Sequence, residues 1–179
     1  MRWCELAEQA PRLAELGRRR LEEPGVVLVG TIRRDGTPRI SPVEPLLWSG
    51  DLWLSMLFRS RKVADLLRDP RVLVHSIVTG RDGGLGEYKV RGSAVEAPPG
   101  PVRDGYAAEV RSRLGWEPTP GRFHLFSVDI QDVTFIRYED ASGDQYVTRW
   151  PLGREFVRRG DGGTALREPE PYQELLISA

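Results

Sequence analysis

The sequence predicts a mainly β protein, an antiparallel barrel with flanking helices. Three observations support this class. Between residues 26 and 150, stretches of strand length alternate apolar and polar side chains and are separated by short turns rich in Gly and Asp. Few helices lie between these stretches, whereas a parallel sheet needs a helix after nearly every strand. The 179 residues are 40% hydrophobic, which suits a single domain with one sizeable core.

Six strands are expected in the barrel, and a short seventh near residues 145–150 precedes a polar tail. The six cover residues 26–32, 39–48, 52–57, 72–78, 87–96 and 123–138. Asp35-Gly36 marks the tip of a hairpin between the first two, because Asp-Gly is a preferred pair in tight hairpin turns. A second turn falls at Ser49-Gly50-Asp51, and a glycine-rich loop falls at 80–86.

Helices are predicted over residues 5–22, 60–69 and 103–114, the first of them broken or started by Pro11. The chain therefore divides into an N-terminal helix at 1–23, a barrel domain at 24–140 and a C-terminal strand and tail at 141–179. We expect the last region to pack on the barrel or on a partner subunit. Part of the polar tail is expected to be disordered.

Composition excludes several classes of function. The formal net charge is zero, so no global field attracts nucleic acid or an anionic membrane. The lone Cys4 excludes an intramolecular disulfide and a cysteine-rich zinc site, and it fits a reducing compartment. No apolar run approaches the roughly 18 residues of a membrane span. The N-terminus has no apolar signal core. A soluble, cytoplasmic protein is expected.

Residues 60–70 have the pattern of a short helix. Ser60 is a residue type that caps helix starts, and Asp69-Pro70 supplies a stop. Apolar residues recur at helical spacing and are expected to face the core: Val63, Leu66 and Leu67.

Arg61 and Lys62 place two cations in the first turn of this helix. The helix macrodipole favours anions there, so the arrangement costs stability unless an anion binds. Backbone N–H groups and the two side chains would give a phosphate both hydrogen bonds and opposite charge. The alternative is a solvated helix start with two exposed cations.

The strand over 39–48 extends this interpretation. Alternation places Arg39 and Ser41 on one face, and Ile40 and Pro42 on the other. Prolines cannot donate to a sheet ladder, so the strand should lie at an edge or a seam of the barrel. Ser55 lies in the next strand, which leads directly into the 60–69 helix. One polar cluster is therefore expected from Arg39, Ser41, Ser55, Arg61 and Lys62. Alternatively, Arg39 is a solvated strand residue and Ser55 has only a packing role.

In this order, the motifs resemble those of the pyridoxamine 5'-phosphate oxidase-like split-barrel superfamily, over roughly residues 24–138. The similarity is greatest to its short, mostly uncharacterised actinobacterial-type members. The matching motifs are Gly30-Thr31-Ile32, Asp35-Gly36-Thr37-Pro38-Arg39-Ile40-Ser41-Pro42, Ser60-Arg61-Lys62, Asp69-Pro70-Arg71-Val72 and Val90-Arg91-Gly92-Ser93-Ala94. The resemblance implies a six-stranded, Greek-key-like split barrel that forms a homodimer, with FMN at the subunit interface and a small-molecule redox substrate.

The resemblance also implies a set of cofactor-binding residues. Arg61 and Lys62 would hold the flavin phosphate. Lys89 is added from its strand face, from which it could reach the ligand of a partner subunit. The full set is Arg39, Ile40, Ser41, Pro42, Ser55, Met56, Ser60, Arg61, Lys62 and Lys89. Lys89 also fits a solvated strand face.

Two departures from the vitamin-processing oxidases argue against oxidation of pyridoxamine 5'-phosphate. Glu44 stands where those enzymes carry a Lys, and their C-terminal Arg-x-His motif is missing. We therefore expect a flavin-dependent oxidoreductase of unknown substrate. One alternative is a reductase that binds an 8-hydroxy-5-deazaflavin in the same groove. Another is a binder of flavin or haem with no catalytic activity.

No metal site is expected. The chain has two histidines, His75 and His124, each within an apolar strand and without a nearby carboxylate in the sequence.

Overall fold

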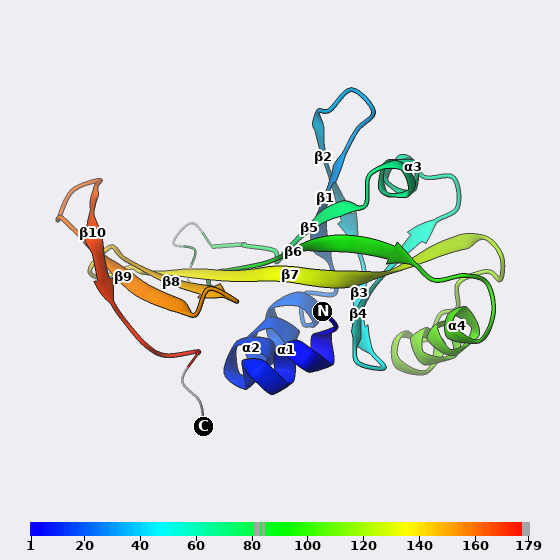
Figure 1. Ribbon diagram of the computed structural model, residues 1–179, viewed down its shortest axis with the longest axis horizontal. Coiled ribbons are helices and arrows are strands. Elements are labelled where there is room, and N and C mark those ends of the chain that lie inside the picture. The colour runs from blue at the N-terminus through cyan, green and yellow to red at the C-terminus, as the bar shows by residue number, and fades with distance from the viewer. Residues whose placement is uncertain (81–82, 84, 177–179) are drawn as a thin grey trace.

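A computed structural model describes residues 1–80, 83 and 85–176 (Figure 1). Within them the helices are α1 (Trp3–Gln9), α2 (Pro11–Glu22), α3 (Arg61–Arg68) and α4 (Pro101–Leu114). The strands are β1 (Val27–Ile32), β2 (Pro38–Val43), β3 (Pro45–Trp48), β4 (Asp51–Leu57), β5 (Arg71–His75), β6 (Glu87–Glu96), β7 (Phe123–Glu139), β8 (Asp144–Trp150), β9 (Arg154–Gly160) and β10 (Leu166–Pro171). The predicted mainly β class with flanking helices is confirmed. Part of the predicted 80–86 loop, residues 81, 82 and 84, lies outside the described residues.

All strand pairs are antiparallel, and the barrel follows the order β2-β1-β5-β6-β7-β4-β3. Only Glu44 separates β2 from β3, so the two ends of this path are adjacent in the chain. A single strand over 39–48 was predicted, and this is wrong. The strand breaks before Pro45, whose missing N–H cannot continue a ladder. As predicted, β2 lies at an edge, and among the described strands it pairs with β1 alone.

The sheet continues beyond the barrel through β8, β9 and β10, which project from the far end of β7 (Figure 1). The structure thus has ten strands in its described residues rather than the seven predicted, and the predicted strand near residues 145–150 corresponds to β8. Disorder was predicted for part of the polar tail, and residues 154–160 and 166–171 of that tail form β9 and β10. Apart from the buried Val157, β9 and β10 have hardly any core face, so their sequence shows little alternation. Pairing onto the long β7–β8 ladder stabilises them instead.

The N-terminal region forms two helices that meet at Pro11, as the sequence allowed. Leu6, Leu13 and Leu21 are fully buried in the same core as the barrel strands. Gly17 allows close approach to β6, because a Cβ there would lie 2.3 Å from Cζ of Tyr88. The buried Tyr88 hydroxyl donates to the backbone oxygen of Leu13 at 3.1 Å. The helices therefore close one side of the barrel.

Helix α4 packs on the outer surface of β3, β4 and β7, away from α1 and α2 (Figure 1). Tyr106 and Val110 of α4 are buried against Trp53 and Leu125 in a second apolar cluster. This helix and the segment that follows it border the hollow surfaces described below.

Candidate functional site

Helix α3 begins where the sequence predicts, and its first turn is polar. The chain leaves β4, passes through Arg59 in a left-handed conformation (φ 61°) and reaches Ser60 at the N-cap position. The Ser60 hydroxyl makes no capping bond, so this part of the prediction is wrong. Its oxygen is buried and has no hydrogen-bond partner among the described residues. A buried hydroxyl without a partner is costly, which marks this position as one where a ligand would restore a hydrogen bond.

The two cations of this turn differ in environment. Arg61 is exposed, whereas Lys62 is half-buried and its Nζ donates to the backbone oxygen of Pro42 at 3.1 Å. Burial lowers the pKa of Lys62. Burial removes water from the ammonium group of Lys62, and an anion beside Nζ would compensate for that lost hydration.

A groove of about 580 Å³ lies beside α3, between β2, β4 and the segment after α4. Four residues of the predicted site line it: Pro42, Ser55, Met56 and Lys62. Its opposite wall includes Trp116 and Arg122, which the sequence analysis did not single out. Ser55 is hydrogen-bonded to Tyr106, and burial raises the pKa of that phenol to about 12. Tyr106 is therefore neutral at physiological pH, and the wall at Ser55 is polar but uncharged.

Arg39 is held by an acidic partner that the sequence analysis missed. Its Nε donates to Oδ2 of Asp65 at 2.7 Å, and the hydroxyl of Thr31 donates to the same oxygen at 3.0 Å. Arg68 adds a weaker ion pair to the other oxygen at 3.6 Å. Burial alone would raise the pKa of Asp65, but the Arg39 and Thr31 hydrogen bonds outweigh it and the pKa is lowered. The available signal was the i,i+3 spacing of Lys62 and Asp65, which puts Asp65 on the same side of α3.

Other predicted residues lie away from the groove. Ile40 is 70% exposed on the outer face of β2, and Ser41 is half-buried on the opposite face. Lys89 on β6 pairs with Glu87 at 2.5 Å. The structure thus joins Ser55 and Lys62 in one groove and holds Arg39 at α3 through Asp65. Lys89 does not line this groove. Leu67 was predicted to face the core together with Val63 and Leu66, and this is wrong, because its side chain is 54% exposed.

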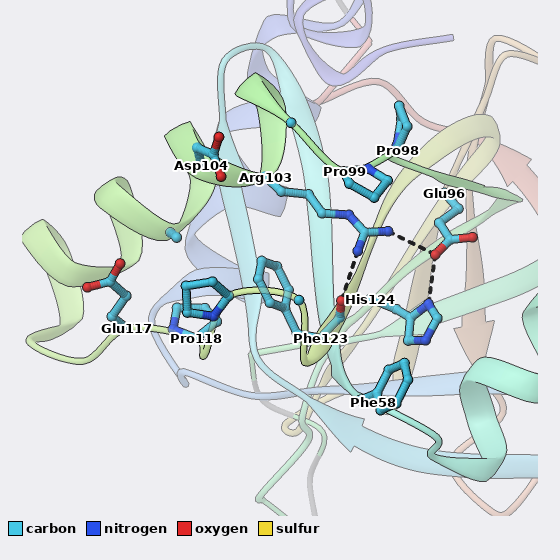
Figure 2. Close-up of a pocket in the computed structure, with 14 residues that line it drawn as sticks. Phe58, Glu96, Pro98, Pro99, Arg103, Asp104, Glu117, Pro118, Phe123 and His124 are labelled. Carbon is cyan, nitrogen blue, oxygen red and sulfur yellow. Dashed lines mark hydrogen bonds and ion pairs between the residues drawn. The ribbon is translucent and has the colours of Figure 1, made fainter.

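A second hollow of about 680 Å³ lies next to the groove, between α4, the end of β6 and the start of β7 (Figure 2). Glu96 and His124 face one another in it, with Nδ1 of His124 2.7 Å from Oε1 of Glu96. Arg103 donates to the same Glu96 oxygen at 2.9 Å. No carboxylate lies near His124 in the sequence, but Glu96 reaches it from a neighbouring strand, 28 residues away. Within the described residues, no three potential ligands from His, Cys, Asp and Glu gather to hold a metal ion.

These features define a β-barrel protein in which two cations and a buried serine hydroxyl lie at the start of α3, beside a groove. The chain belongs to the pyridoxamine 5'-phosphate oxidase family, whose model matches residues 13–137. The family suggested by the sequence motifs is thereby confirmed.

Solved structures with the same fold have low sequence identity to this chain. A nimC/nimA family protein from Clostridium acetobutylicum is 15% identical, with a TM-score of 0.59, and the match covers 79% of this chain and 92% of that one. An F420 reductase is 21% identical (TM-score 0.51; 65% and 94% covered). A heme binding protein from Mycobacterium smegmatis is 16% identical (TM-score 0.51; 74% and 57% covered). A comparison with curated proteins finds no match. In the part of the chain that the structure describes, no helix is long and apolar enough to span a membrane.

Proposed function

We propose that this protein is an FMN-binding oxidoreductase that holds the flavin phosphate at the start of α3 and the ring system along the adjoining groove. The buried, unpartnered hydroxyl of Ser60 carries this proposal, because it lies in the same turn as the poorly hydrated Lys62. A phosphate would accept hydrogen bonds from Ser60 and from the free N–H groups of the first turn. It would also neutralise Arg61 and Lys62.

The remaining residues of the predicted set have supporting roles in this proposal. Pro42, Ser55 and Met56 line the groove and would contact the ring. Arg39 keeps two guanidinium nitrogens beyond the Nε that Asp65 holds, so it can still donate to a ligand beside β2. The bound flavin supplies the hydride chemistry, and the protein supplies position and electrostatics.

We further propose that two copies of the chain associate through the outer face of β2, β1 and β5. Ile40 is 70% exposed and Leu73 is 40% exposed there. Both pair with Gly30 in the sheet register, so they flank a position without a side chain and form a flat apolar surface. Ile40 and Lys89 would then approach the cofactor of the partner subunit. The test is the oligomeric state: Ile40→Asp and Leu73→Asp together should yield monomers in sedimentation experiments, and a wild-type protein that is already monomeric contradicts this part.

A deazaflavin is the second candidate, favoured by Arg122 in the groove wall. The longer acidic tail of that cofactor needs cations beyond those that hold FMN. Oxidation of pyridoxamine 5'-phosphate is not proposed, because Glu44 adds a carboxylate to the groove and would repel a second phosphate.

The decisive experiment is a titration of the purified protein with FMN and, in parallel, with the deazaflavin, followed by fluorescence and by thermal unfolding. Tighter binding of FMN supports the main proposal, and tighter binding of the deazaflavin supports the second candidate. Binding of neither contradicts both. A bound flavin that no nicotinamide or deazaflavin donor reduces would indicate a binder without redox activity.

The matched variants test the location. Arg61→Ala with Lys62→Ala should weaken FMN binding by about a hundredfold, since two charge-assisted hydrogen bonds of about 1.5 kcal/mol each are lost. Arg18→Ala with Arg19→Ala is the control, because it removes the same charge from an exposed surface of α2. Equal effects of the two double variants would refute the phosphate assignment.

A further inference from the structure

His124 and Glu96 form an oriented pair at the wall of the second hollow (Figure 2). An ionised carboxylate can only accept hydrogen bonds, so the proton of this bond is on Nδ1 of His124. In neutral His124 the lone pair is therefore on Nε2, for which no partner exists among the described residues. Carboxylate–imidazole pairs of this kind leave Nε2 available as a hydrogen-bond acceptor.

The imidazole is also fixed by aromatic rings. Phe58 stacks on it with a centroid distance of 5.6 Å and an interplanar angle of 9°, and Phe126 stacks at 6.3 Å and 15°. Phe58 is itself 43% exposed at the hollow. Rigid apolar walls are added by four prolines: Pro98, Pro99, Pro118 and Pro120. A flat ring would therefore find complementary surface beside Nε2.

Charge in the hollow disfavours an anion. Arg103 is the cation closest to the pair, but each of its three guanidinium nitrogens already donates, to Glu96, to the backbone oxygen of Ala97 at 2.8 Å and to that of Phe123 at 3.0 Å. Asp104 adds one carboxylate to the lining, and Glu117 adds a second that is paired with Arg111 at 3.1 Å. A neutral ligand with a donor group suits this surface better than a phosphate or a carboxylate.

We propose that this hollow is a second small-molecule site, which binds a neutral, planar aromatic compound carrying a hydroxyl group. The hydroxyl donates to Nε2 of His124, and the ring packs on Phe58 and the prolines. Glu117, Pro118 and Phe123 border both this hollow and the groove beside α3, so the occupant lies next to the groove. The proposal rests on the hollow itself and holds whichever cofactor the groove binds.

The test uses 2-naphthol as the probe and 2-methoxynaphthalene as its control, which lacks the donor. The chain has only two histidines, so two imidazole Cε1–H signals are expected in a proton–carbon correlation spectrum, and His124→Phe assigns them. We expect 2-naphthol to shift the His124 signal and not that of His75. It should bind about tenfold more tightly than the methyl ether, the effect of one net hydrogen bond. Equal binding of the two compounds, no binding, or equal shifts of both histidines would overturn the proposal.

Three variants of the protein complete the test. His124→Phe keeps the stacked rings and removes Nε2, so it should bind both compounds equally. Glu96→Gln keeps a hydrogen-bond acceptor for Nδ1 and should retain part of the preference for 2-naphthol. Arg61→Ala with Lys62→Ala should lose FMN binding and keep 2-naphthol binding, which separates the two sites. Loss of both in that variant would contradict a second site, provided that its circular dichroism is unchanged. If His124→Phe does not fold, the comparison of the two compounds on the wild-type protein still decides.

Discussion

Replacement of Asp65 by Asn tests whether the charge of this buried carboxylate holds β2 against α3. The Asp65 side chain is 5% exposed, and Arg39 and Arg68 are 23% and 35% exposed. Removal of one partner from a fully buried pair costs about 3–5 kcal/mol. Because both arginines partly reach solvent, we reduce this to about 2–3 kcal/mol. At about 2–4 °C per kcal/mol for a chain of this size, the Tm should fall by about 4–12 °C.

The pH dependence separates charge from packing. The pKa of Asp65 is lowered in the folded protein, so its contribution is fully present above the unfolded pKa of about 3.9 and is lost as pH falls through the folded value. The gap in unfolding free energy between wild type and Asp65→Asn should therefore be constant at pH 5–7 and narrow below about pH 4.

Urea denaturation between pH 3 and pH 7 measures this gap. Asp132→Asn serves as the control, since Asp132 pairs with the largely exposed Arg91 and should cost less than about 1 kcal/mol. A gap of the same size at pH 3 and pH 7 would show that packing, rather than charge, accounts for the effect. No gap at pH 7 would refute the role of Asp65 altogether.

Three further predictions concern the packing of the helices and the C-terminal segment. Gly17→Ala should destabilise the protein by about 1–3 kcal/mol in denaturant, despite better helix propensity, because the new Cβ meets the Tyr88 ring at 2.3 Å; a more stable variant would mean that this contact relaxes freely. Tyr88→Phe removes the second of two hydrogen bonds to the Leu13 carbonyl, which keeps its helical bond from the N–H of Gly17, and should cost about 0.5–1.5 kcal/mol by the same assay; a neutral result would contradict a stabilising role for the hydroxyl. Glu155 accepts backbone N–H groups at residues 174–176, so Glu155→Gln should speed amide exchange there and spare the barrel; unchanged exchange would argue against this anchor. Burial alone would raise the pKa of Glu155, but the hydrogen bonds from residues 174–176 lower it. In the wild-type protein, the attachment of residues 174–176 to the Glu155 carboxylate should therefore weaken as pH falls below about 4.3.

The sequence predicted those elements whose stability comes from local pattern. Alternation with Asp-Gly turns indicated the barrel strands, and the stop at Asp69-Pro70 indicated the end of α3. Strands β9 and β10 escaped prediction because their backbone pairs with strands already in place while their side chains stay largely in solvent. Stabilisation by backbone pairing alone leaves no apolar periodicity in the sequence.

Pairs between distant residues were the other source of error. Arg39 and Asp65 are 26 residues apart, and Glu96 and His124 are 28 apart. Taken singly, each of these four side chains fits an ordinary solvated or buried position, so the sequence gives no sign of its partner. Only the register of β6 on β7 and of β1 on β2 brings the partners together, and that register depends on the whole barrel.

The Arg39–Asp65 pair changes how charge is distributed around α3. If Arg39 were unpaired, three cations would surround the start of the helix and their repulsion would add to the unfavourable macrodipole. Asp65 neutralises Arg39 and fixes its guanidinium, which leaves Arg61 and Lys62 as the net charge facing an incoming anion. Lys62 is the more sensitive of the two, because burial lowers its pKa whereas Arg61 stays hydrated. The affinity for a phosphate should therefore depend more on Lys62 than on Arg61, even though the two are adjacent and carry the same charge.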